Sequence, residues 1–404
     1  MTDSLGVWMV GALGGIGTTL VVGARALARG LTQDTGLITN QAEFAPLDLA
    51  PVQDMVFGGH EVRLSNYWDS ACEIAKRSRS IDYELLIQLK NDLLDISEAL
   101  KPGTAVNCGS AIDAVVTNPV TRHDDGLRAI VQRIQSDLRA FRARESVERV
   151  VVVNLASTEP DLPELQALGS PEDFERLLDE SDSRRIRPST LYAYAAFKEG
   201  CAFINFTPSA AALCPMLQRI GDASGMPYMG SDGKTGETLV KSALAPMFKY
   251  RNLKVLSWQG YNMLGDRDGQ ILAHADNLAT KVRSKDAVLS SILGYPVHTH
   301  VGIDFVESLH DLKTAWDFIH FEGFLGHRMT MQFTWQGCDS ILAAPLVLDM
   351  VRLADLAMRR GEKGAMVQLA PYFKAPLGVS QHDLHAQFHG MIDYFRGSGA
   401  RLDG

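Results

Sequence analysis

The segment Gly11–Thr19 carries residues that could bind a pyrophosphate. Its glycines have the spacing GxxGxxG, and they lie between a short apolar run and a helical pattern that extends through Leu27. Glycines at such a turn let the backbone approach a pyrophosphate, and the following helix N-terminus presents unpaired N–H groups. Leu13 stands where the stricter GxGxxG motif has its second glycine, so a purely structural turn is the alternative. The predicted dinucleotide-binding residues are Gly11, Gly14, Gly15, Ile16, Gly17 and Thr18.

A second segment, residues 230–238, could hold the phosphate of a smaller molecule. It combines glycines and hydroxyl side chains at the start of a predicted helix, where backbone N–H groups attract anions. Its GKT at 233–235 resembles the tail of a P-loop, but Tyr228 stands where a P-loop needs its first glycine. Residues 258–269 then concentrate Asn, Asp and Gly after an apolar run, which indicates either a polar site or an ordinary loop.

Two further patterns indicate other chemistry. Tyr194 and Lys198 form a YxxxK motif, which resembles the extended short-chain dehydrogenases, whose Tyr and Lys share proton transfer. That family leaves little chain after its substrate segment, whereas about 200 residues follow Lys198 here. His298 and His300 share one face of a predicted strand, but the spacing reveals no third ligand, so no metal site is expected.

Composition limits the partners and the compartment. The net charge of -9 argues against a nucleic-acid or anionic-membrane surface, because such partners select for excess Lys and Arg. The first residues have no basic n-region, and charged residues interrupt the apolar stretch 342–356 before it could span a membrane. We therefore expect a soluble cytoplasmic protein. An odd set of cysteines without CxxC predicts buried thiols in a reducing cytosol: Cys72, Cys108, Cys201, Cys214 and Cys338.

The predicted elements place these motifs in an α/β fold. Short apolar runs alternate with helical patterns over the first 235 residues, which predicts a doubly wound parallel sheet covered by helices, a Rossmann domain. The strands are expected at 7–10, 104–107, 149–154 and 202–205, and the helices between them at 83–100 and 189–199, the latter capped by Ser189.

The pattern changes after residue 235. A helix at 237–250 precedes strand-like segments at 254–258, 298–306 and 329–335, which predicts a mixed α+β domain. Asp339 or Ser340 is expected to cap a long helix that ends near Gly361 and packs back on the first sheet. We expect a Rossmann domain of residues 1–238 plus 343–404 and an inserted domain of residues 239–342.

Several blocks of the sequence resemble inositol-3-phosphate synthases and occur in the same order. They are GALGGIGTTL, GSDGKTGETLVKS, GYNMLGDRDG, VRSK, KTAWD, CDSILAAPL and FKAPL, and they span nearly the whole chain. The resemblance implies bound NAD, an inserted catalytic and tetramerisation domain, a homotetramer, and conversion of the hexose phosphate glucose 6-phosphate to inositol phosphate.

The resemblance also implies roles for individual residues. Its essential lysines correspond to Lys285, Lys313 and Lys374. Polar residues of the nicotinamide and sugar site correspond to Asp232, Asn262, Asp268 and Asp339. The phosphate loop corresponds to Lys234, Thr235, Gly236, Glu237 and Thr238, and cofactor contacts to Ser157 and Thr158. The acid for the adenine ribose corresponds to Glu61, although position alone also suggests Glu43.

In the implied mechanism, NAD takes a hydride from C5 of the sugar, and the ketone makes the neighbouring proton acidic. The resulting enolate adds to the C1 aldehyde, and the hydride returns. Lys285 and Lys374 are expected to transfer protons and stabilise oxyanions, and Lys313 to stabilise the aldol alkoxide.

Two departures weaken the charge complementarity expected at the phosphate. Leu289 stands where the family commonly has a second lysine, and Glu237 replaces a neutral amide. Both changes make the phosphate site less positive unless Arg283 or Lys234 compensates. The sequence therefore leaves open a paralogue that cyclises fructose 6-phosphate to a five-membered cyclitol phosphate, or a plain dehydrogenase.

Overall fold

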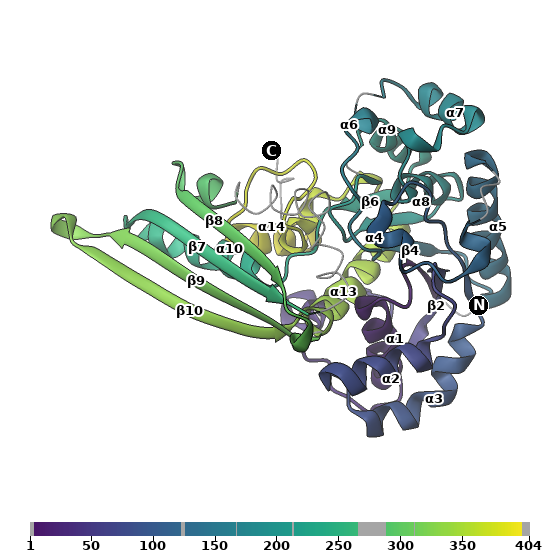
Figure 1. The fold of residues 1–404 in the computed structure, drawn as a ribbon, viewed down its shortest axis with the longest axis horizontal. Helices are drawn as coiled ribbons and strands as arrows, with labels where there is room; N and C mark the ends of the chain where they lie inside the picture. The colour runs from purple at the N-terminus through teal and green to yellow at the C-terminus, as the bar shows by residue number, and fades with distance from the viewer. Residues whose placement is uncertain are drawn as a thin grey trace.

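A computed structural model describes residues 4–122, 126–166, 168–211, 214–265, 288–310 and 312–397. Its larger sheet has seven strands in the order β11-β6-β5-β4-β1-β2-β3, and every neighbouring pair is parallel (Figure 1). The order β3-β2-β1-β4-β5-β6 is that of a dinucleotide-binding fold, which confirms the predicted class. The strands are β1 (Leu5–Val10), β2 (Met55–Glu61), β3 (Leu100–Pro102), β4 (Val150–Asn154), β5 (Ala202–Asn205), β6 (Pro227–Gly230) and β11 (Gly364–Ala365).

Helices cover both faces of this sheet, because alternate residues of each buried strand point into separate cores. Val7 and Met9 of β1 face a core with α1, α2, α3, α13 and α14, whereas Trp8 and Val10 face one with α5, α7, α8 and α9. The helices are α1 (Gly15–Ala28), α2 (Tyr67–Ser78), α3 (Tyr83–Ser97), α4 (Ser110–Asp113), α5 (Leu127–Glu145), α6 (Pro163–Gln166), α7 (Pro171–Glu180), α8 (Pro188–Lys198), α9 (Pro215–Ser224), α10 (Gly236–Tyr250), α13 (Asp339–Arg359) and α14 (Leu384–Phe395). No helix within the described ranges is long and apolar enough to cross a membrane.

A second sheet of four strands extends away from the first (Figure 1). Its order is β10-β9-β7-β8, with β7 and β8 parallel and the other pairs antiparallel. Helix α10 packs on one face through Ala245 and Phe248, and α13 then leads the chain back to the first sheet, where it contacts α1. The strands are β7 (Lys254–Leu264), β8 (His298–Phe305), β9 (Leu312–Glu322) and β10 (Arg328–Cys338).

Several local expectations were wrong, among them the cap of α13, which is Cys338 rather than Asp339 or Ser340. Residues 104–107 form no strand, and the third strand is the shorter β3. Ser189 lies inside α8 rather than capping it, because Pro188 begins the helix. Strand β7 continues to Leu264 through a segment that its polar residues made look like a loop. The predicted pattern also omitted four strands: β2 and β6 of the first sheet, β9, whose one face is open, and β11, which has only two residues.

Candidate active site

One cavity of about 300 Å³ lies where the carboxyl ends of β1, β2, β4 and β5 meet β7 of the second sheet. In doubly wound sheets ligands bind at this edge. Most of the residues expected from the sequence line it: Gly11, Gly14, Gly15, Ile16, Glu61, Ser157, Thr158, Asp232, Thr235, Glu237, Thr238, Asn262, Lys313, Asp339 and Lys374.

The glycine turn forms one wall of the cavity. Gly11 has φ +78°, a conformation that favours glycine, and a Cβ at Gly17 would lie 2.4 Å from the carbonyl oxygen of Ala12. Helix α1 begins after Gly14 with no side-chain cap, so the first backbone N–H groups stay available to an anion. Gly17 and Thr18 are buried beneath the turn and do not line the cavity.

Glu61 ends β2 beside this turn. Its carboxylate accepts hydrogen bonds from the Leu13 N–H at 2.8 Å and the Val62 N–H at 3.0 Å, and Arg63 pairs with it at 3.2 Å. An acid at the end of the second strand is where Rossmann folds bind a ribose. The other candidate, Glu43, does not line the cavity.

Glu159 is a buried carboxylate in the same wall, and the sequence reasoning missed it. It directly follows Ser157 and Thr158 after β4, and it accepts a hydrogen bond from the Ser189 N–H at 2.8 Å as well as one from the Ser189 hydroxyl. Burial raises its pKa to about 7, although both hydrogen bonds oppose the shift. The cavity therefore contains a carboxyl group that titrates near neutral pH.

Glu159→Gln is expected to flatten the dependence of stability on pH. The pKa in the folded chain is raised from 4.5 to about 7, so this contribution to stability is complete below pH 4.5 and is lost as pH rises through 7. The loss amounts to about 3 kcal/mol, since one pKa unit corresponds to about 1.4 kcal/mol. Urea unfolding at pH 5 and pH 8 without cofactor measures the difference; parallel pH profiles for the two proteins would contradict it.

The loop between β6 and α10 presents polar groups to the cavity, but Lys234 points elsewhere. Asp232, Thr235 and Thr238 line the cavity, whereas the Lys234 ammonium donates to Gln387 Oε1 of α14 at 2.6 Å. Burial lowers the pKa of Lys234 to about 7. Lys234 therefore attaches the loop to α14 and does not supply the compensating charge.

Two lysines that the resemblance singled out converge on the cavity, each held by a carboxylate. Lys374 Nζ lies 2.8 Å from Asp232 Oδ1, and Lys313 Nζ lies 3.2 Å from Asp339 Oδ2. The backbone also joins the first pair, because the Lys374 N–H donates to the Asp232 carbonyl at 2.7 Å. These contacts fix two ammonium groups in one site. Lys285 and Asp268 lie outside the described residues.

Glu237 lies in the first turn of α10, and its negative charge is compensated inside the fold. Its carboxylate lies 2.5 Å from Lys241 Nζ and accepts a hydrogen bond from Asn262 Nδ2 at 2.6 Å. All three side chains are buried. The neighbouring strand leaves room for this carboxylate, because a Cβ at Gly260 would lie 2.2 Å from Glu237 Oε1. Sequence reasoning overlooked Lys241, although its i,i+4 spacing from Glu237 was the available signal.

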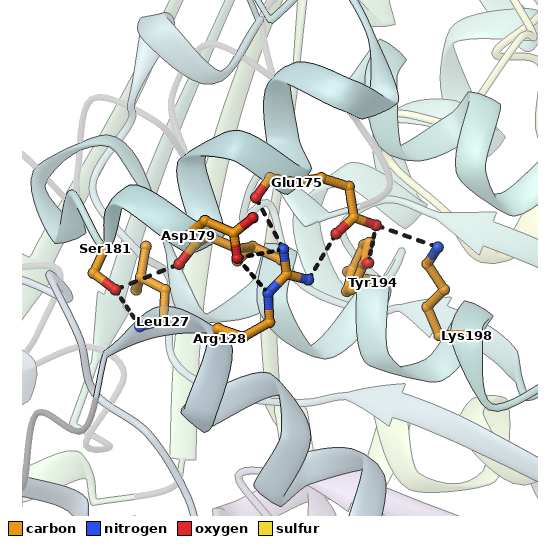
Figure 2. A network of polar contacts seen from close by, with 8 residues as sticks. Leu127, Arg128, Glu175, Asp179, Ser181, Tyr194 and Lys198 are labelled. Atoms are coloured by element: carbon orange, nitrogen blue, oxygen red, sulfur yellow. Dashed lines mark hydrogen bonds and ion pairs between the residues drawn. The ribbon is translucent and has the colours of Figure 1, made fainter.

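The YxxxK pair lies apart from the cavity. Figure 2 shows Tyr194 and Lys198 of α8 both directed at Glu175, which Arg128 also contacts at 2.6 Å. Neither residue of the pair lines the cavity, and burial together with the Glu175 carboxylate raises the pKa of the Tyr194 hydroxyl. A tyrosine in this position is unsuited to donate or accept protons in catalysis, so the dehydrogenase hypothesis loses its catalytic pair.

Tyr194→Phe is expected to leave turnover within about twofold of the parent and to cost about 1 kcal/mol of stability. The substitution removes the hydroxyl that donates one hydrogen bond to Glu175. Such hydrogen bonds contribute about 0.5–1.5 kcal/mol to the free energy of unfolding, or more when the acceptor is charged. Steady-state kinetics and thermal unfolding test both values. A loss of turnover larger than tenfold would restore the dehydrogenase hypothesis.

The strand histidines offer no metal site of their own. His298 and His300 lie on β8, where both are exposed. In the part of the chain that the structure describes, no group of three His, Cys, Asp or Glu side chains is arranged to hold a metal ion.

Comparison with known proteins decides the family. A family model described as myo-inositol-1-phosphate synthase, an NAD-binding family, matches residues 5–396. The chain belongs to this family. Inositol-3-phosphate synthase 1 from Bacteroides thetaiotaomicron is 34% identical over 96% of this chain and 94% of its own.

Solved structures agree on the fold of the synthase family. An inositol-3-phosphate synthase from Caenorhabditis elegans matches with a TM-score of 0.87 at 22% identity, covering 100% of this chain and 87% of its own. A myo-inositol-1-phosphate synthase-related protein from Thermotoga maritima matches with a TM-score of 0.80 at 21% identity, covering 98% and 100%. Both sheets therefore have counterparts in synthase structures.

Proposed function

We propose that this protein converts glucose 6-phosphate to inositol 3-phosphate with NAD as cofactor. Curated relatives named inositol-3-phosphate synthase support the reaction, and so does the matching family model. The observation that carries the proposal is a shared cavity. The glycine turn and the lysines Lys313 and Lys374 all line it, so a dinucleotide and a sugar phosphate would meet there.

The residues present fit a dinucleotide. The uncapped N-terminus of α1 suits the pyrophosphate, and Glu61 at the end of β2 suits the adenine ribose. Ser157 and Thr158 line the same cavity as Lys374 and Asp232. When bound, NAD supplies reversible hydride transfer, so the sugar is oxidised and later reduced without net redox change.

The side chains of this protein account for the remaining chemistry. Proton abstraction beside a ketone develops an enolate, and ring closure develops an alkoxide; both need positive charge close by. The ammonium groups of Lys374 and Lys313 would supply it, since Asp232 and Asp339 hold them in position. The hydroxyls of Thr235 and Thr238 would bind the phosphate, as the start of a helix favours anions.

The decisive experiment supplies purified protein and NAD with glucose 6-phosphate, identifies the product by NMR and follows NADH absorbance. A six-membered cyclitol phosphate without NADH accumulation supports the proposal. Steady NADH production would indicate a dehydrogenase, and cyclisation of fructose 6-phosphate alone would indicate the five-membered product. Either of those outcomes would overturn the proposal.

A homotetramer is part of the proposal, supported by the open face of the second sheet. Tyr261 and Trp316 stack there with ring centroids 5.8 Å apart and are 39% and 37% exposed. Phe318 and His320 continue the row of rings along β9. Exposed aromatic patches of this kind are typical of subunit interfaces. Light scattering of the protein and of Trp316→Glu tests it: a monomeric parent, or a variant of unchanged mass, contradicts this interface.

The same proposal assigns residues 239–342 to an inserted catalytic and oligomerisation unit and the rest to the NAD-binding domain. The second sheet and its core lie within residues 254–338, apart from part of α10. We also place the protein in the cytoplasm, because all five cysteines are free thiols. Limited proteolysis with mass spectrometry tests the division, and cell fractionation tests the compartment.

A further inference from the structure

His310 occupies a backbone conformation that a histidine adopts only at a cost. It follows the short 3₁₀ helix Glu307–Leu309 and precedes β9, with φ 52° and ψ -126°. These angles belong to the first central position of a type II′ turn, where glycine is strongly preferred. The His310 backbone also lies close to the residue that follows β7, because a Cβ at Gly265 would lie 2.3 Å from the His310 nitrogen.

The His310 side chain forms few stabilising contacts within the fold that would offset this backbone strain. Its Nδ1 atom is buried, and it has no hydrogen-bond partner among the described residues. A buried polar atom without a partner is a further cost. Strained residues of this kind persist mainly at functional sites, and His310 lines the same cavity as Lys313, three residues further along the chain.

In the part of the chain that the structure describes, each lysine or arginine lining the cavity is paired with a carboxylate; Arg63 pairs with Glu61 and Arg77 with Glu73. Lys313 and Lys374 each share their charge with a carboxylate, and Lys234 points toward Gln387 instead of the cavity. Leu289, where the resemblance would have a second lysine, is buried in the core of the second sheet. A donor that no carboxylate already holds would therefore add to the Thr235 and Thr238 hydroxyls in binding a phosphate ester.

We propose that His310 binds the substrate by donating a hydrogen bond from its imidazole to a phosphate oxygen of the sugar phosphate. The inference rests on the proposed function, since it assumes that the sugar phosphate occupies this cavity. It makes His310 a specificity-determining residue of this chain. The contact would provide such a donor, and it accounts for a histidine at a position whose backbone favours glycine.

The test compares His310→Gly, His310→Gln and a matched control. His310→Gly relieves the strained backbone and removes the donor, so the melting temperature should rise while KM for glucose 6-phosphate increases about tenfold or more. The NAD dissociation constant should stay within twofold. His310→Gln keeps a donor and should recover part of the KM. The control Leu325→Gly, at φ 61° and 89% exposed in the β9–β10 connection, should raise the melting temperature alone.

An unchanged KM in His310→Gly would overturn the inference, and so would a KM for His310→Gln no better than that of His310→Gly. Calorimetric titration with inorganic phosphate tests the His310–phosphate contact independently of turnover, so failure of the contact can be told apart from failure of the proposed function. If the parent turns over no hexose phosphate, weaker phosphate binding by His310→Gly than by the parent still supports the contact. Equal phosphate affinities overturn it.

Discussion

Replacing Lys374 with methionine is expected to lower turnover by about a thousandfold or more while NAD binding stays unchanged. The side chain is 9% exposed, and its ammonium is held 2.8 Å from Asp232 in the cavity wall. Removing one preorganised donor to a developing oxyanion costs about 10²–10³ in rate, and losing a proton-transfer group costs about 10²–10⁴. Methionine preserves most of the packing volume, so the protein should still fold.

Two controls distinguish loss of chemistry from loss of structure in the Lys374 variant. Lys254→Met removes an exposed lysine at the start of β7 and should leave turnover unchanged. Asp232→Asn keeps the shape of the pair but removes its charge, so it should lower turnover less than Lys374→Met does. Fluorescence titration with NADH measures cofactor affinity. If Lys374→Met retains more than a tenth of the parent turnover, Lys374 has no direct part in the reaction.

The first sheet was predictable in part, because some of its buried parallel strands are short apolar runs, whereas β2 and β6 were not expected. The runs at 149–154 and 202–205 became β4 and β5 within one residue at either end. The second sheet was harder, since alternate residues of β9 face solvent and its polar positions hide the strand. β11 could not be predicted at all, because two residues carry no periodicity and only its parallel pairing with β6 defines it.

The candidate site was predictable as a set of segments but not as a set of side-chain directions. The sequence reasoning brought Asp232, Asn262 and Lys313 to one site, and all three line the cavity. It also grouped Lys234 with them, yet this lysine, two positions after Asp232, points to α14. The directions of neighbouring side chains depend on local backbone angles, such as φ 61° at Asp232. The strained conformation of His310 is likewise a property of its backbone angles, which the residue type did not reveal.

Removing either partner of the Glu237–Lys241 pair is expected to destabilise the protein by about 3–5 kcal/mol. Both side chains are at most 1% exposed, and breaking a buried ion pair from one side leaves an uncompensated charge in a medium of low polarity. Lys241→Met leaves the Glu237 carboxylate without this ammonium, and Glu237→Gln leaves the ammonium without this carboxylate. The two single variants should therefore be similarly unstable in urea unfolding.

The double variant Glu237→Gln/Lys241→Met should regain most of that stability, because no charge of this pair remains buried. Well-packed neutral replacements of buried ion pairs are often as stable as the pair itself. The glutamine can still accept the hydrogen bond that Asn262 Nδ2 donates to Glu237, so Asn262 should keep its place beside the phosphate loop and turnover should survive. A double-mutant cycle from urea unfolding gives the coupling energy. If the two destabilisations simply add, Glu237 and Lys241 do not stabilise each other, and the anion in the phosphate loop is compensated elsewhere.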